Sequence, residues 1–286
     1  MDLQKARYFL GSAAKRLRGA GLACPSCGES RASIVDRKYF VTSLARCARC
    51  RLLFRAPTMA ADESEHFYQA AYQQGFTTEM PSDAELACML QAGFGPERDY
   101  GAYVEVLDAL GCRPGTRIID FGCSWGYGSW QLLRRGYEVQ AFEVSQPRGG
   151  FAREKLGIDV VSSLEAARGP FDVFFSAHVL EHVPSVAEAV RRGMSLLRPG
   201  GLFVAFTPNG SAQFRATDPG AWHKLWGLVH PQLIDAEYYR RLFADRACLL
   251  ASSPYDAHGI SGWRENPVAA VELALAGPEL LCVALR

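Results

Sequence analysis

The chain has 286 residues, 49% of them hydrophobic and 21% charged, which is typical of a globular protein with a full core and a small extra domain. It has no run of about 18 apolar residues, which excludes a membrane-spanning helix, and its N-terminus lacks the compact apolar core of a signal peptide. Nine cysteines without a secretion signal favour a reducing compartment, so we expect a cytoplasmic protein whose paired cysteines bind metal.

The net charge of +1 hides an asymmetry along the chain. Twelve Lys and Arg against three acids give residues 1–55 a charge of +9, so the remainder carries −8. This basic head indicates either a contact with nucleic acid, phosphate or a membrane surface, or simply a solvated face. The first part of it, residues 3–17, has the spacing of a short basic amphipathic helix. Such a helix either makes a peripheral membrane contact or, as we expect, packs on the body.

Two C-x2-C pairs follow, Cys24 with Cys27 and Cys47 with Cys50. Zinc prefers four tetrahedral ligands, and a two-residue gap lets one tight turn supply two sulfurs. The β-branched and aromatic residues between the pairs predict a short hairpin that brings them together. We therefore expect a structural zinc ribbon in residues 1–55, with no open coordination position for chemistry. Four unrelated core thiols are the weaker alternative, because Pro, Ser, Gly and Arg surround them.

Residues 56–100 have helical stretches and are expected to link the ribbon to the body, residues 101–286. The body begins with an apolar strand that enters a glycine-rich turn at Gly122 and Gly126, followed by a helix. A second strand ends at Glu143, where a carboxylate can accept both hydroxyls of a ribose. Strands and helices then alternate to the end of the chain, which predicts an α/β doubly wound sheet with its ligand at the carboxyl ends.

From about residue 100 onward the chain resembles a class I S-adenosylmethionine (SAM)-dependent methyltransferase. DFGCSWG matches that family's D-x-G-x-G-x-G motif, and FEVS, FDVFFSAHVLEHVPS and LLRPGGLFVAFTPN match its next three motifs in order. The whole chain resembles bacterial methyltransferases with an N-terminal zinc ribbon, many of which modify sugars or polysaccharide precursors. The resemblance implies a Rossmann-like sheet of seven strands, the last of them antiparallel.

The resemblance also implies SAM as the cofactor. Its expected contacts are Tyr100, Asp120, Gly122, Cys123, Ser124, Gly126, Glu143, Val144, Ser163, Ser176, Ala177 and His178. Ser124 departs from the motif, because it stands where the family usually has its middle glycine, with bulky Trp125 beside it. A Cβ at this position narrows the approach of the backbone to the cofactor, so either the loop shifts or binding is lost.

His178, Glu181 and His182 spell H-x-x-E-H, which matches a zinc-protease signature. They follow a strand directly, and Pro184 leaves no room for the long helix that such a protease needs. By the resemblance, ubiquinone-pathway O-methyltransferases have a similar E-x-x-E-H segment here. Small-RNA 2′-O-methyltransferases have one too, with a further His that completes a divalent metal site, for which His230 is the counterpart. We expect these four residues to act as base or acceptor-binding groups, to hold a second divalent metal, or only to order the loop.

Residues 210–231 form a long connection that is expected to be a lid. Its Trp222, His223 and Trp226 suit either an acceptor pocket or a hydrophobic cap. We expect transfer of a methyl group to a hydroxyl of a sugar, a nucleotide sugar or a glycan precursor, with the basic ribbon holding a phosphate of the acceptor. One alternative is an rRNA or tRNA methyltransferase whose ribbon grips RNA. Another alternative is a non-catalytic binding module that no longer binds SAM.

Overall fold

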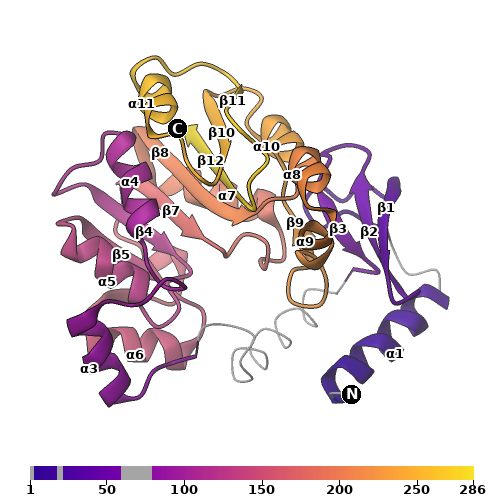
Figure 1. Cartoon of the computed structure of the whole chain (residues 1–286), viewed down its shortest axis with the longest axis horizontal. Coiled ribbons are helices and arrows are strands. Elements are labelled where there is room, and N and C mark those ends of the chain that lie inside the picture. The colour runs from indigo at the N-terminus through magenta and orange to yellow at the C-terminus, as the bar shows by residue number, and fades with distance from the viewer. Residues whose placement is uncertain (1–2, 18–21, 59–78) are drawn as a thin grey trace.

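In the computed structural model of the chain, the described residues are 3–17, 22–58 and 79–286. They form two sheets, one of eight strands and one of four, which are flanked by helices (Figure 1). None of the helices in these ranges is long and apolar enough to cross a bilayer. Part of the predicted linker, residues 59–78, lies outside the described residues.

The larger sheet has the Rossmann-like arrangement. Its strands are β4 Arg117–Phe121, β5 Glu138–Phe142, β6 Asp159–Val161, β7 Phe171–Ala177, β8 Leu197–Pro208, β10 Cys248–Ser252, β11 Val271–Glu272 and β12 Glu279–Leu285. They lie in the order β11-β10-β12-β8-β7-β4-β5-β6. β4 lies between two parallel neighbours, β5 and β7. The winding direction therefore switches at β4, and this switch leaves a crevice at the carboxyl ends of the strands.

The α/β doubly wound class is confirmed, and β12 is antiparallel to both of its neighbours. The predicted number of seven strands is wrong, because β11 adds an eighth at the edge, parallel to β10. A strand of two residues has no alternation that a sequence pattern could reveal, since recognisable strands run over at least four residues.

Helices cover both faces of this sheet. They are α4 Gly101–Ala109, α5 Tyr127–Arg134, α6 Gln146–Leu156, α7 Val186–Leu196, α10 Ala236–Leu242 and α11 Ala257–Glu265. Successive side chains of a strand point to opposite faces. Phe174 of β7 accordingly packs in the cluster that includes α7 and α10, whereas Phe175 packs in the cluster that includes α4 and α11. A short 3-10 helix, η1 (Leu164–Ala166), follows β6.

The smaller sheet carries the cysteine pairs. β1 (Ala32–Lys38), β2 (Thr42–Cys47) and β3 (Leu53–Ala56) form an antiparallel meander, which confirms the predicted hairpin. β9 (Gln232–Leu233) comes from the predicted body, residues 101–286, and completes this sheet by pairing with β3. The ribbon therefore takes one of its strands from a segment far along the sequence.

The predicted lid contains two short helices, α8 (Ala212–Thr217) and α9 (Pro219–Lys224). Its Trp222 and Trp226 are buried with Leu44 and Leu53 of the ribbon sheet. This packing favours the interpretation of Trp222 and Trp226 as a hydrophobic cap over their interpretation as part of an acceptor pocket. The remaining helices in the described ranges are α1 (Leu3–Leu17), beside the ribbon in Figure 1, and α3 (Asp83–Ala92), whose Leu86 packs near the loop after β4.

Candidate active site and zinc site

Four cysteine thiols meet in the ribbon. The Sγ atom of Cys24 lies 3.5 Å from that of Cys50, and the Sγ atom of Cys27 lies 3.5 Å from that of Cys47. All four sulfurs lie within 4.8 Å of one another. Zn–S bonds of about 2.3 Å in a tetrahedron place sulfurs about 3.8 Å apart, so these thiols fit a zinc ion. Burial opposes ionisation of Cys27, but a backbone hydrogen bond at Glu29 and the Arg49 side chain lower its pKa to about 6, which favours the thiolate that zinc binds.

The loop between β4 and α5 carries the cofactor motif. Gly122 and Gly126 have φ angles of +86° and +94°, in the left-handed region that favours glycine. A Cβ on Gly122 would lie 2.5 Å from Cγ2 of Val179, and one on Gly126 would lie 2.5 Å from Cδ1 of Ile158. Both backbone conformation and packing therefore require glycine at these two motif positions.

Ser124 adopts a left-handed conformation in the same loop, with φ of +53°. Its N–H donates to Oε2 of Glu143 at 2.9 Å, and its Oγ accepts a hydrogen bond from Nη1 of Arg148 at 2.6 Å. The neighbouring Trp125 is fully buried and packs near Phe94. The bulk of the indole therefore lies in the core, and the serine hydroxyl is held by α6.

Glu143 lies just beyond the carboxyl end of β5 and is 3% exposed. Besides the Ser124 N–H, its carboxylate accepts the N–H of Ser145 at 2.7 Å. Burial raises the pKa of Glu143, and these backbone donors oppose the shift. A cavity of about 570 Å³ opens beside this carboxylate, within the usual range for small-ligand sites. Four of the predicted SAM contacts line it, namely Gly122, Glu143, Val144 and Ser163.

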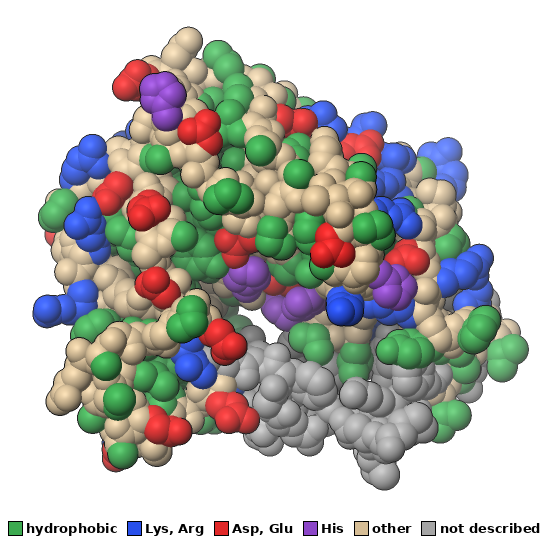
Figure 2. All heavy atoms as spheres, viewed as in Figure 1, with side chains coloured by type: hydrophobic (Ala, Val, Ile, Leu, Met, Phe, Trp, Pro, Cys, Tyr) green, Lys and Arg blue, Asp and Glu red, His purple; other side chains and the backbone are tan. Residues whose placement is uncertain are grey.

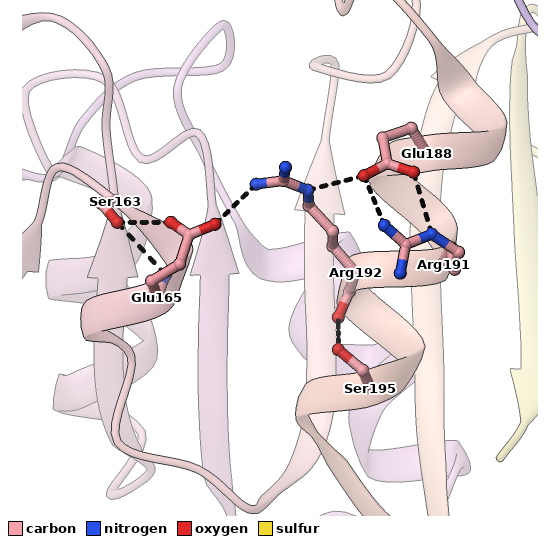
Figure 3. A network of polar contacts seen from close by, with 6 residues as sticks. All are labelled: Ser163, Glu165, Glu188, Arg191, Arg192 and Ser195. Carbon is pink, nitrogen blue, oxygen red and sulfur yellow. Dashed lines mark hydrogen bonds and ion pairs between the residues drawn. The ribbon is translucent and has the colours of Figure 1, made fainter.

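A polar network joins two walls of this cavity (Figure 3). Arg192 of α7 lies 2.9 Å from Oε1 of Glu165, in η1, and 2.8 Å from Oε1 of Glu188 on its own helix. Ser163 donates to Glu165 and also caps η1 through its side chain. The network therefore ties the segment after β6 to the helix after β7.

The other predicted SAM contacts do not line this cavity. Asp120 is buried in β4, where it accepts the hydroxyl of Ser129 at 2.5 Å, and burial raises its pKa to about 6. The ring of Tyr100 lies against Gly128, where a Cβ would come within 2.1 Å of its Cζ. Ser176 of β7 is fully buried, and its hydroxyl has no hydrogen-bond partner among the described residues. The roles of Tyr100, Asp120, Cys123, Ser124, Gly126, Ser176, Ala177 and His178 toward SAM stay predictions, and so do those of the four residues that line the cavity.

The segment of the H-x-x-E-H sequence is a turn between β7 and α7, and it contains no helix. Glu181, His182 and His230 offer ligand atoms that all lie within 4.8 Å of one another. Figure 2 shows histidine side chains beside a hollow in the middle of this face of the molecule. Three of the four residues predicted to be catalytic therefore form one cluster, which joins the turn after β7 to the end of the 210–231 segment.

The hydrogen bonds of the two imidazoles suit metal ligation. Nδ1 of His182 lies 2.9 Å from the carbonyl oxygen of Val229, and Nδ1 of His230 lies 2.7 Å from that of Leu225. Because a carbonyl only accepts, each Nδ1 carries the proton, and in the neutral ring Nε2 carries the lone pair. A backbone carbonyl that holds Nδ1–H is the usual outer partner of a metal-binding histidine.

Glu181 is 1% exposed, and neither of its carboxylate oxygens has a hydrogen bond among the described residues. Its Oε1 lies 3.5 Å from Nδ1 of His178 and 3.8 Å from Nε2 of His182. Burial opposes ionisation, but these imidazoles hold the pKa of Glu181 at about 2. A buried carboxylate normally has its lone pairs satisfied, so this donor set fits a divalent cation bound by oxygen and nitrogen.

His178, the fourth predicted catalytic residue, is tied to a carboxylate that the sequence analysis did not single out. Its Nε2 lies 2.5 Å from Oε2 of Glu279, at the start of β12. The hydroxyls of Tyr103 and Tyr255 donate to the same carboxylate. Burial opposes protonation, but the carboxylates of Glu181 and Glu279 raise the pKa of His178 to about 10. The only signal in the sequence was a charged residue at the edge of an apolar strand.

The curated relatives of the chain match about half of its length. Over 164 residues it is 30% identical to the ubiquinone biosynthesis O-methyltransferase of Caulobacter sp. (strain K31), an alignment that covers 54% of the chain and 65% of the relative. Over 159 residues it is 33% identical to the protein of the same name from Xanthomonas campestris pv. campestris (strain B100), covering 50% and 66%. The chain thus spans slightly less than two thirds of the length of either relative.

Among solved structures, the plantazolicin methyltransferase BamL aligns at 12% identity with a TM-score of 0.49, covering 79% of this chain and 97% of that one. The model of the family described as "Methyltransferase domain" matches residues 97–248, which include the glycine loop, Glu143 and the histidine cluster. The chain therefore belongs to this methyltransferase family and is a SAM-dependent methyltransferase that carries an N-terminal four-cysteine cluster.

Proposed function

We propose that this enzyme transfers the methyl group of SAM to a hydroxyl oxygen of an acceptor held beside a divalent cation at Glu181, His182 and His230. The observation that carries the proposal is the buried Glu181 carboxylate, whose oxygens have no hydrogen bond to any described residue, while two imidazoles turn their protonated Nδ1 atoms toward carbonyl groups. A cation at this cluster would lower the pKa of an acceptor hydroxyl bound to it.

In this proposal, the residues around the cofactor and the acceptor each have one role. Glu143 holds the ribose of SAM at the carboxyl end of β5, and the glycine loop lets backbone approach the cofactor. Transfer requires the acceptor oxygen, the methyl carbon and the sulfur to be aligned. His178 is 46% exposed in its side chain and is fixed by Glu279, and in this proposal it orients the acceptor. The 210–231 segment carries His230 and helps to exclude water.

We propose a sugar or nucleotide-sugar hydroxyl as the acceptor, because two adjacent hydroxyls can offer a cation two oxygen ligands. An acceptor from ubiquinone biosynthesis is the second candidate, favoured by the names of the curated relatives. Neither the comparisons nor the cluster supports a role in polysaccharide biosynthesis in particular, so no such role is proposed for the methylated sugar.

RNA as the acceptor receives less support from the charges of the ribbon. Arg46 lies 2.8 Å from Asp235 and 2.9 Å from Glu237, and Arg51 lies 2.7 Å from Glu237. Both arginines pair with acidic side chains at the start of α10. Part of the +9 charge is therefore used in ion pairs between the ribbon and the body. Binding to RNA requires Lys and Arg side chains that can reach its phosphates. The non-catalytic alternative is disfavoured because the chain belongs to a family of enzymes.

Metal binding tests the cluster directly. We expect the full-length protein with S-adenosylhomocysteine to bind Mn²⁺, measured by electron paramagnetic resonance, at a site distinct from its zinc. His230→Ala should weaken Mn²⁺ binding by about tenfold or more and leave the zinc content unchanged. His258→Ala, which changes an exposed histidine of α11, is the matched control and should bind Mn²⁺ as the parent does. Absence of Mn²⁺ binding by the parent would refute the metal site.

The acceptor is tested with methyl-labelled SAM and a fractionated cell extract. Label in the sugar and nucleotide-sugar fraction that survives mild base supports the main proposal, because methyl ethers resist base whereas methyl esters are cleaved. Base-stable label in the solvent-extracted quinone fraction selects the second candidate. Nuclease-sensitive label would overturn both in favour of RNA.

A further inference from the structure

The hairpin of the ribbon ends in two exposed aromatic residues. Tyr39 and Phe40, in the turn between β1 and β2, are 70% and 96% exposed. Their φ angles of +54° and +60° are left-handed, a region that Asn, Asp and Gly adopt most readily. Neither burial nor backbone preference explains large aromatic side chains here. Two adjacent, exposed aromatic side chains at the end of a hairpin are typical of a surface that contacts another molecule.

Helix α1 adds to the same end of the molecule. Nη1 of Arg16 donates to the carbonyl oxygen of Phe40 at 2.7 Å, which places the last turn of α1 against the hairpin. Leu10 and Leu17 are 73% and 90% exposed. They are seven positions apart and so lie on one face of the helix. Figure 1 shows α1 next to the β1–β2 end of the ribbon.

The charge around these apolar residues is positive. Lys15 and Arg16 occupy the last turn of α1, and exposed Arg37 precedes the aromatic turn. The nearby acid, Asp36, is turned inward, where its Oδ2 lies 2.6 Å from His223 and accepts the indole N–H of Trp226 at 3.0 Å. We name this region the tip surface, defined by Leu10, Arg16, Leu17, Arg37, Tyr39 and Phe40. Figure 2 shows exposed hydrophobic and basic side chains on the same end of the molecule.

We propose that the tip surface docks the enzyme onto an anionic lipid bilayer. Aromatic and leucine side chains enter the interfacial layer, while neighbouring arginines meet lipid phosphates. Two exposed leucines favour lipid over RNA, because single-stranded nucleic acid selects flat rings for stacking. The positive charge also disfavours a second copy of the chain on this surface, since like charges would face each other. The inference does not depend on which acceptor is methylated.

Docking of the tip surface on a bilayer would also affect the segment that carries His230. His223 of α9 contacts Asp36 of β1, and the carbonyl oxygen of Trp226 accepts a hydrogen bond from Lys38. Both contacts belong to the 210–231 segment that ends near His230. The bilayer would therefore hold the hairpin and the segment that supplies a residue of the candidate active site.

The test is co-sedimentation of the full-length protein with vesicles. We expect binding to vesicles of equal parts phosphatidylcholine and phosphatidylglycerol, weaker binding at high salt, and little binding to phosphatidylcholine alone. Tyr39→Asn with Phe40→Gly supplies residues that suit the turn. This double variant should melt no lower than the parent yet lose about tenfold or more in vesicle affinity. Val268→Ser, which removes an exposed apolar side chain elsewhere, should bind as the parent does.

Any of the following results would overturn the proposal. The parent could fail to bind the anionic vesicles, or the double variant could bind them as well as the parent does. The parent could also ignore vesicles while binding a homopolymeric RNA, or while forming a dimer that the double variant abolishes. A Phe40→Ser variant tests the same surface with one change, and it should lose vesicle affinity in the same direction.

Discussion

Replacing Glu143 is the sharpest test of the cofactor site. The side chain is 3% exposed, and its two oxygens accept N–H groups at 2.9 and 2.7 Å. In the SAM complex, it is expected to accept the two ribose hydroxyls. A hydrogen bond to a charged group contributes about 1.5–3 kcal/mol, so losing two of them costs about 3 kcal/mol at the low end. At about 1.4 kcal/mol per tenfold change, affinity should fall by about 100-fold in Glu143→Ala.

The assay is calorimetric titration with S-adenosylhomocysteine, with thermal melting of each protein alongside. Glu143→Gln keeps the shape and one strong acceptor, so its loss should be smaller, about tenfold. Glu138→Ala changes an exposed acid at the other end of the same strand and serves as the matched control. If folded Glu143→Ala bound S-adenosylhomocysteine within about threefold of the parent, the ribose would lie elsewhere and the assignment of the cavity would be wrong.

Three further substitutions test the structure. Gly122→Ala places a Cβ 2.5 Å from Val179 at a left-handed φ and should destabilise the fold by about 1–3 kcal/mol in urea unfolding; an unchanged unfolding midpoint would contradict the packing argument. Cys27→Ser should release zinc, measured by metal analysis of the purified protein, and retention of a full equivalent would show that the four thiols are not its ligands. Arg46→Ala leaves Asp235 buried without its cation and should cost about 3 kcal/mol of unfolding free energy; a loss below about 1 kcal/mol would mean that the pair does not join the ribbon to the body.

The sequence could predict the features that depend on local patterns. The glycine loop, Glu143 and the paired cysteines each sit in a short motif whose spacing follows from the chemistry of its ligand. The alternation of apolar strands with helices indicated the doubly wound sheet. These features need only neighbours along the chain, and a pattern of residues can record them.

Contacts between segments that are far apart along the chain could not be predicted from the sequence. Glu279 meets His178 across 101 positions, and no local signal marks the two as partners. The packing of Trp226 on the ribbon and the inward pairing of Arg46 likewise depend on how the two sheets meet. The sequence showed that residues 1–55 are basic, but it could not show that some of these basic side chains form ion pairs with the body.

The pairing of β3 with β9 has a consequence for how the protein folds. Phe54 pairs with Gln232, so during synthesis the four clustered cysteines emerge long before the strand that completes their sheet. Zinc can order the early hairpin, but β3 then has an unpaired edge until the later segment arrives. An open edge of this kind is a site for intermolecular pairing, and contacts so distant along the chain form slowly. An excised ribbon should therefore aggregate more readily than the full-length enzyme, and the two sheets should unfold as one cooperative unit.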